Sequence, residues 1–75
     1  MSDRIRAAIL DLALQRGRDK SLCPSEVAKA LSADWRPLMP EVRAVAAATP
    51  EIVATQGGIE VDPLAAQGPI RLRLR

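Results

Sequence analysis

A proline and a glutamate fix the start of a helix near residue 24, and this boundary constrains the fold more than any other feature of the chain. Pro24 suits the first helical position, where its missing N–H costs nothing. Glu26 suits the third position, from which its carboxylate can reach back to the N–H of the capping residue. That residue is Cys23, and Leu22 and Val27 occupy the two positions of a hydrophobic staple. We therefore expect a helix that begins at Pro24 and ends near residue 31.

A short polar turn, residues 32–34, leads from this helix into a second one. It is short enough to hold the two helices at a steep angle, as in a helix-turn-helix. Asp34 is placed to cap the next helical segment. Pro40 deep in one helix would remove a backbone hydrogen bond and clash with the preceding turn. Either residues 35–39 form a separate short turn or one helix kinks at Pro40, and we favour the separate turn. The helix should end near Thr49, because a residue before proline resists helical geometry.

Apolar residues at helical spacing give three helices an inward face. The first is predicted from Ser2 or Asp3 to Gln15 or Arg16, and Gly17 can end it in the left-handed conformation. Because Phe and Tyr are absent, the core must consist of small aliphatic side chains and Trp35. The residues expected to face inward are Ile5, Ala8, Ile9, Leu12 and Ala13, then Val27, Ala30 and Leu31, and then Leu38, Val42, Val45 and Ala46.

The last third of the chain changes to strand patterns. Residues 51–56 are rich in β-branched side chains, Gly57 and Gly58 suit a tight turn, and residues 59–61 continue extended. After a loop at 62–69, residues 70–75 alternate leucine or isoleucine with arginine, which indicates a half-buried strand. Three helices followed by a two-strand C-terminal hairpin make an α+β, mostly helical winged helix-turn-helix.

Composition limits the chain to one small domain. Its 75 residues form a single winged-helix domain, 1–75, of marginal stability. The single cysteine excludes an intrachain disulfide and a zinc site built from cysteine pairs. No signal segment and no bilayer-spanning apolar run is evident, so we expect a cytoplasmic protein with no membrane partner.

Several residue blocks are unusual in combination. They read Cys-Pro-Ser-Glu-Val-Ala at 23–28, Trp-Arg at 35–36 with Leu-Met-Pro at 38–40 and Val-Arg at 42–43, then Asp-Pro at 62–63 and Gly-Pro-Ile-Arg at 68–71. In these blocks and their order the chain resembles the small bacterial domain-of-unknown-function family 3253. The resemblance implies a winged-helix fold and brings no established activity, ligand or catalytic residue.

An enzyme is not expected. The chain has no His and no Tyr, and Cys23, although at a helix N-terminus, has no base nearby in the sequence. A cap or small core residue is the better interpretation of Cys23. The acidic residues show no metal-ligand spacing, and no glycine-rich phosphate loop precedes a helix, so no catalytic residue, metal or cofactor is predicted.

The fold favours non-catalytic binding of DNA or RNA through phosphate contacts. The candidate contact residues are Lys29, Arg36, Arg43, Arg71 and Arg73. A solvated arginine face that binds nothing is an equally good interpretation. Against base recognition, the outer face of the third helix past Arg43 carries only alanines, and Glu60 and Asp62 lie in the segment that would form the wing. Trp35 is better placed as a core or helix-start anchor than as a stacking platform.

The alternative is a protein-interaction module or small dimer with no nucleic-acid role. The small-residue face of Ala44, Ala47 and Ala48 would let another backbone approach closely. The arginine-rich last strand could pair with an acidic partner or with another strand, and a marginal core favours a homodimer.

Overall fold

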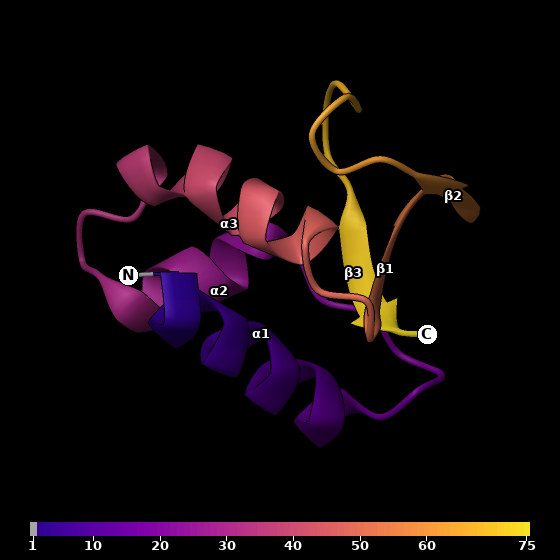
Figure 1. Ribbon diagram of the computed structural model, residues 1–75, viewed down its shortest axis with the longest axis horizontal. Helices are drawn as coiled ribbons and strands as arrows, with labels where there is room; N and C mark the ends of the chain where they lie inside the picture. The colour runs from indigo at the N-terminus through magenta and orange to yellow at the C-terminus, as the bar shows by residue number, and fades with distance from the viewer. Residues whose placement is uncertain (1) are drawn as a thin grey trace.

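The computed structural model describes residues 2–75, which form an α+β fold of three α-helices and a three-stranded antiparallel sheet (Figure 1). The helices lie together on one side of the molecule and the sheet on the other, with the C-terminus on its last strand. In chain order the elements are α1 (Ser2–Arg16), α2 (Pro24–Leu31), the 3-10 helix η1 (Arg36–Leu38), α3 (Met39–Ala47), β1 (Ile52–Gln56), β2 (Ile59–Val61) and β3 (Arg71–Leu74).

Helix α1 has the predicted bounds and the predicted inward face. Ile5, Ile9 and Ala13 are completely buried, and Ala8 and Leu12 pack against the core at its margin. The helix ends where Gly17 takes a φ of 87°, a left-handed conformation that costs glycine little. The N–H of Gly17 closes the last turn on the carbonyl of Ala13.

Helix α2 also begins and ends as predicted, but its inward face is rotated toward a different alanine. Val27 and Ala28 are completely buried, Leu31 is half-buried, and Ala30 is exposed. The prediction for Ala30 was wrong because α2 is packed by both α1 and α3. Together α1 and α3 cover a wider part of the α2 surface than one stripe of apolar residues would occupy. Ala28 lies in the covered part, and Ala30 lies outside it.

The segment before α3 confirms the separate turn. Helix η1 occupies Arg36–Leu38, and α3 begins at Met39, so Pro40 stands in its first turn, where no backbone N–H is needed. Asp34 does not cap this segment as expected. Trp35 holds the N-cap position, and no side-chain hydrogen bond caps it.

The sheet has three strands in the order β2-β1-β3, rather than the two-strand hairpin predicted from the sequence. Strand β1 is central because it pairs with β2 through the Gly57-Gly58 turn and also with β3 after the loop at 62–70. Val61, Ala54 and Leu72 lie in line across the inner face of the sheet. Glu60, Thr55 and Arg71 lie in line across the outer face.

A single residue between the first two helices ties them to the sheet. Leu22 forms an isolated bridge to Leu72 of β3, with two backbone hydrogen bonds of 2.8 Å. Both leucines are completely buried in the core between the helices and the inner face of the sheet. At the end of α3, the buried hydroxyl of Thr49 donates to the carbonyl of Val45 at 2.7 Å, so this polar group is satisfied inside the core.

None of the helices within residues 2–75 combines the length and the apolar character needed to cross a bilayer.

Candidate nucleic-acid interface

The five basic residues predicted to contact phosphate do not form one set in the structure. Lys29 and Arg36 meet at Trp35, Arg71 is bound to the segment before α2, Arg43 is bound to the loop at 62–70, and Arg73 lies on the outer face of β3.

Trp35 brings two of these cations together. The ammonium of Lys29 lies 4.8 Å from the centroid of the indole ring, and the guanidinium carbon of Arg36 lies 4.5 Å from it. Both distances are within the range of a cation–π interaction. Trp35 is half-buried against the core, while Lys29 and Arg36 are exposed. One aromatic side chain thus holds two solvent-facing positive charges at the junction of α2 and η1.

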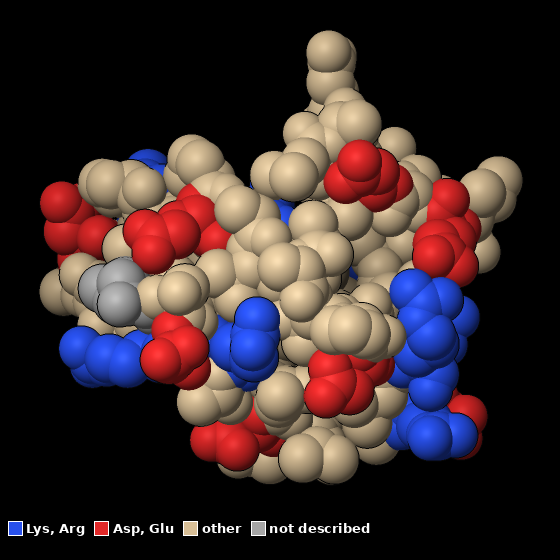
Figure 2. Space-filling model, viewed as in Figure 1, with Lys and Arg blue, Asp and Glu red and all other residues tan. Residues whose placement is uncertain are grey.

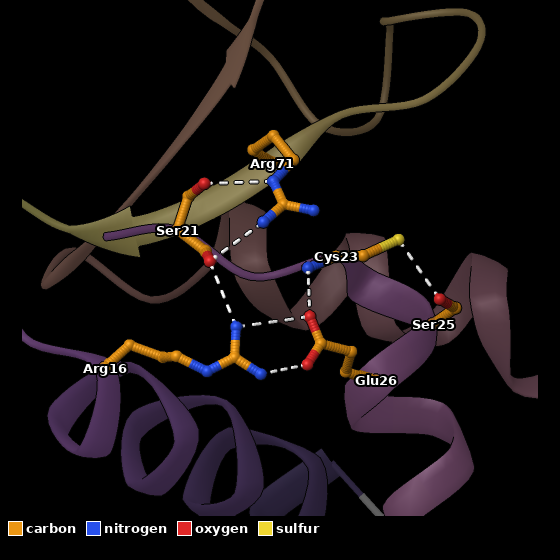
Figure 3. Close-up of polar contacts among 6 residues, drawn as sticks. All are labelled: Arg16, Ser21, Cys23, Ser25, Glu26 and Arg71. Atoms are coloured by element: carbon orange, nitrogen blue, oxygen red, sulfur yellow. Dashed lines mark hydrogen bonds and ion pairs between the residues drawn. The ribbon is translucent and has the colours of Figure 1, made fainter.

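Arg71 is held in place by Ser21 (Figure 3). Its Nε donates to the Ser21 hydroxyl at 2.9 Å, and its Nη2 donates to the Ser21 carbonyl, also at 2.9 Å. That carbonyl also accepts a 3.2 Å hydrogen bond from Arg16 at the end of α1. One carbonyl oxygen therefore joins the end of α1 to the start of β3.

Glu26 completes this network from α2. Its carboxylate pairs with Arg16 and accepts a 2.9 Å hydrogen bond from the N–H of Cys23, which confirms the predicted capping contact of Glu26. The side-chain hydrogen bond from Arg16 is the largest cause that lowers the pKa of Glu26 below its ordinary value, and the Cys23 N–H adds to it. Glu26 therefore stays charged at neutral pH and links α1 to α2 (Figure 3).

Arg43 lies on α3 and binds the loop at 62–70. Its guanidinium donates to the carbonyls of Pro63 at 3.4 Å, Ala66 at 2.8 Å and Gly68 at 2.7 Å. Three of its five N–H directions can be used by these contacts. This geometry gives Arg43 a structural role in holding the loop against α3, whatever else its charge contributes.

Two further arginines lie at the C-terminal end of the chain, Arg73 on the outer face of β3 and Arg75 just after it. Arg73 is exposed, and its only hydrogen bond within residues 2–75 is a marginal one of 3.5 Å to the carbonyl of Leu74. Arg75 donates to the carbonyl of Pro50 at 3.2 Å and pairs with Glu60 of β2 at 3.3 Å. Val53 is nevertheless buried on this face, because it stands opposite Arg73, whose long stem can cover it.

On the face drawn in Figure 2 the surface charge is mixed rather than segregated. Figure 2 shows acidic and basic side chains interspersed on one face, with the largest basic group at the edge where Figure 1 places the C-terminus. Acidic groups lie above it, over β2 and the loop. A polyanion would therefore meet separate positive areas rather than one continuous basic face.

Cys23 has a structural setting. It occupies the N-cap position of α2, and its sulfur accepts a 3.1 Å hydrogen bond from the Ser25 hydroxyl. Within residues 2–75, no three His, Cys, Asp or Glu side chains are grouped to hold a metal ion.

Sequence reasoning missed two residues that organise this surface. Ser21 lies between the first two helices, and nothing in its local sequence signals the contact with Arg71 of β3. Arg75 was treated as part of an arginine-rich edge, and its pairing with Glu60 depends on the two strands both flanking β1.

Comparison with known families gives one result. The family model described as "Protein of unknown function (DUF3253)" matches residues 2–75, which is nearly the whole chain. No curated protein matches the sequence.

Proposed function

The chain belongs to the DUF3253 family, and we propose that it is a winged-helix domain that binds nucleic acid without catalysis, through contacts to phosphate groups. The observation that supports this most is the pair of exposed cations, Lys29 and Arg36, held on Trp35 where α2 leads into α3. In a helix-turn-helix this junction faces the backbone of the duplex.

The connectivity supports the winged-helix part of the proposal. The short extended segment at Leu22, between α1 and α2, bridges to β3, and β3 pairs in turn with β1 after α3. The loop at 62–70 together with β2 then takes the position of the wing. Arg43 fastens that loop to α3, which would keep helix and wing in a fixed relation.

The proposed contacts are to phosphate rather than to bases. The exposed side chains on α3 and at its C-cap include Glu41, Ala44, Ala47 and Ala48, and none of these four can donate a hydrogen bond to a base edge. Lys29, Arg36 and Arg73 provide positive charge with few internal partners, and Arg71 adds charge at a position fixed by Ser21. Such a set gives affinity that depends on salt and little on sequence.

Trp35 makes the proposal easy to test, because it is the only aromatic residue in the chain. Titrating the protein with duplex DNA or RNA at low salt should change the fluorescence of Trp35, since the two cations that would bind phosphate lie on its ring. The double variant Lys29→Ala, Arg36→Ala should lose most of the binding.

Arg18→Ala is the matched control, since it removes an exposed arginine beyond the far end of α1 and should bind nearly as the wild type does. Absence of binding to any duplex at low salt, or equal losses in the double variant and the control, would refute the proposal.

One observation favours a second candidate, a protein-interaction module or small homodimer. Ala44, Ala47 and Ala48 are all exposed, so α3 presents a face without long side chains that another backbone can approach. Analytical ultracentrifugation across a concentration series would reveal a dimer, and a monomer that binds duplex in a salt-dependent way would rule this candidate out.

A further inference from the structure

A groove of about 510 Å³ lies where the end of α3, strands β1 and β2 and the following loop meet. Seven of its ten lining residues are apolar, including Ala46, Ala47, Ala54 and Val61, and the other three are charged. At its rim the apolar side chain of Leu64 is 62% exposed. The groove can therefore bury an apolar side chain of moderate size.

The groove also lies at a step in the sheet, by which we mean the place near Ile52 where β1 extends beyond its pairing with β2. Strand β1 pairs with β3 from Ile52 to Thr55, but it pairs with β2 only from Ala54 to Gln56. At Ile52 the side of β1 that faces β2 is therefore left without a partner strand within residues 2–75. The chain leaves β2 after Val61 and turns away into the loop.

The hydrogen-bond pattern shows what this step offers. Backbone groups along a strand face its two neighbours alternately. The carbonyl of Glu51 accepts from the N–H of Arg75 on the β3 side, so the carbonyl of Ile52 faces the opposite side, into the step. An extended chain placed there would meet a backbone acceptor, as in peptides that add to the edge of a sheet.

Charge at the rim sets the chemistry of the occupant. Glu60 and Asp62 both line the groove, and Arg75, which pairs with Glu60, is the one basic residue among its lining. The carboxylate of Asp62 is exposed and accepts only the N–H of Leu64 within the described part of the chain. In Figure 2 acidic groups separated by uncharged surface occupy the region over β2 and the loop.

From these features we propose that the groove binds an extended peptide segment of another protein in which apolar residues alternate with lysine or arginine. The segment would continue the line of β2 alongside Ile52, place an apolar side chain on the alanine floor, and direct a cationic one to Asp62. This inference goes beyond nucleic-acid binding and uses a different surface.

A second copy of the chain is a poorer occupant. The only segment of this chain with the required alternation is β3, and its Leu72 is completely buried in the core. A copy could offer that strand only by unfolding, so the partner is a different polypeptide.

The test is a titration of the ¹⁵N-labelled full chain, followed by amide NMR shifts, with two capped synthetic peptides. One contains Lys-Val-Lys-Val-Lys and the other Glu-Val-Glu-Val-Glu, so that they differ only in charge. We expect saturable shifts with the basic peptide, largest at Ala47, Ile52, residues 60–62 and Leu64, and none with the acidic peptide. The fluorescence of Trp35 should stay unchanged, which separates this site from the proposed nucleic-acid surface.

Two variants test the site itself. Ala47→Gln places a longer side chain in the groove and should abolish the peptide-induced shifts, whereas Ala44→Gln, exposed on the same helix but outside the groove lining, should not. Asp62→Asn keeps the acceptor for the Leu64 N–H but removes the charge, and should weaken binding about two- to fivefold. Equal shifts with both peptides, shifts on another surface, no saturable binding, or equal effects of the two alanine variants would overturn the proposal.

Discussion

The guanidinium of Arg43 donates a 2.7 Å hydrogen bond to the carbonyl of Gly68, a residue 25 positions further along the chain. Gly68 has a φ of 83°, so the loop turns in a left-handed conformation at the point where Arg43 holds it. With the further bonds to Ala66 and Pro63, this side chain fixes the loop that precedes β3.

Removing this anchor should destabilise the protein more than it weakens nucleic-acid binding. Arg43→Ala leaves three loop carbonyls without their donor, and because they can partly rehydrate we expect a loss of about 1–2 kcal/mol in the free energy of unfolding. For a domain of this size that lowers the melting temperature by about 5–15 °C, measurable by circular dichroism. Arg36→Ala, as a control on an exposed arginine, should change it little. A stable Arg43→Ala protein would show that the anchor is dispensable.

Acid should weaken the link between α1 and α2. The pKa of Glu26 is lowered in the folded protein by its hydrogen bond with Arg16 and by the Cys23 N–H. The stability that it contributes is therefore complete above the unfolded value, about 4.3, and is lost as pH falls through the lower folded value. In urea titrations, Glu26→Gln should be less stable than wild type at neutral pH, and the difference should shrink as the pH falls through this window. Glu41→Gln, exposed on α3, is the control, and a gap between wild type and Glu26→Gln that does not change with pH would contradict this account.

The assignment of the core predicts that alanine substitutions at two leucines differ strongly in their effect on the free energy of unfolding. Leu72→Ala removes a completely buried side chain of β3 from the core between the helices and the inner face of the sheet, and should cost about 2–5 kcal/mol. Total stability for a chain of this length is only roughly 4–11 kcal/mol, so a large part would be lost. Leu64→Ala, at an exposed position, should change the urea midpoint little. Similar midpoints for the two variants would mean that the core is wrongly assigned.

Local signals in the sequence were enough to predict the helices. Pro24 and Glu26 act within one turn of α2, and Pro40 can be accommodated only near a helix start, so both boundaries follow from neighbouring residues. The alternation of leucine and arginine likewise identified β3, because a strand that is half-buried must alternate. An alanine gives little indication of whether it faces the core. For that reason the prediction that Ala30 rather than Ala28 is buried was wrong.

Long-range pairing could not be predicted. The separation between Arg71 and Ser21 is 50 residues, and nothing in either side chain identifies the other. The position of β1 between β2 and β3 likewise depends on where the loop at 62–70 returns the chain, which Arg43 helps to decide. The role of the candidate contact residues therefore stays a prediction, while the internal hydrogen bonds of Arg43 and Arg71 appear only in three dimensions.

The most direct test of phosphate binding is the slope of the logarithm of the duplex association constant against the logarithm of salt concentration, followed through Trp35. If Lys29, Arg36, Arg71 and Arg73 each meet one phosphate, the slope should be about −3.6, and Arg36→Ala should reduce it to about −2.7 while changing the melting temperature little. A slope near zero, or one that Arg36→Ala leaves unchanged, would contradict the account.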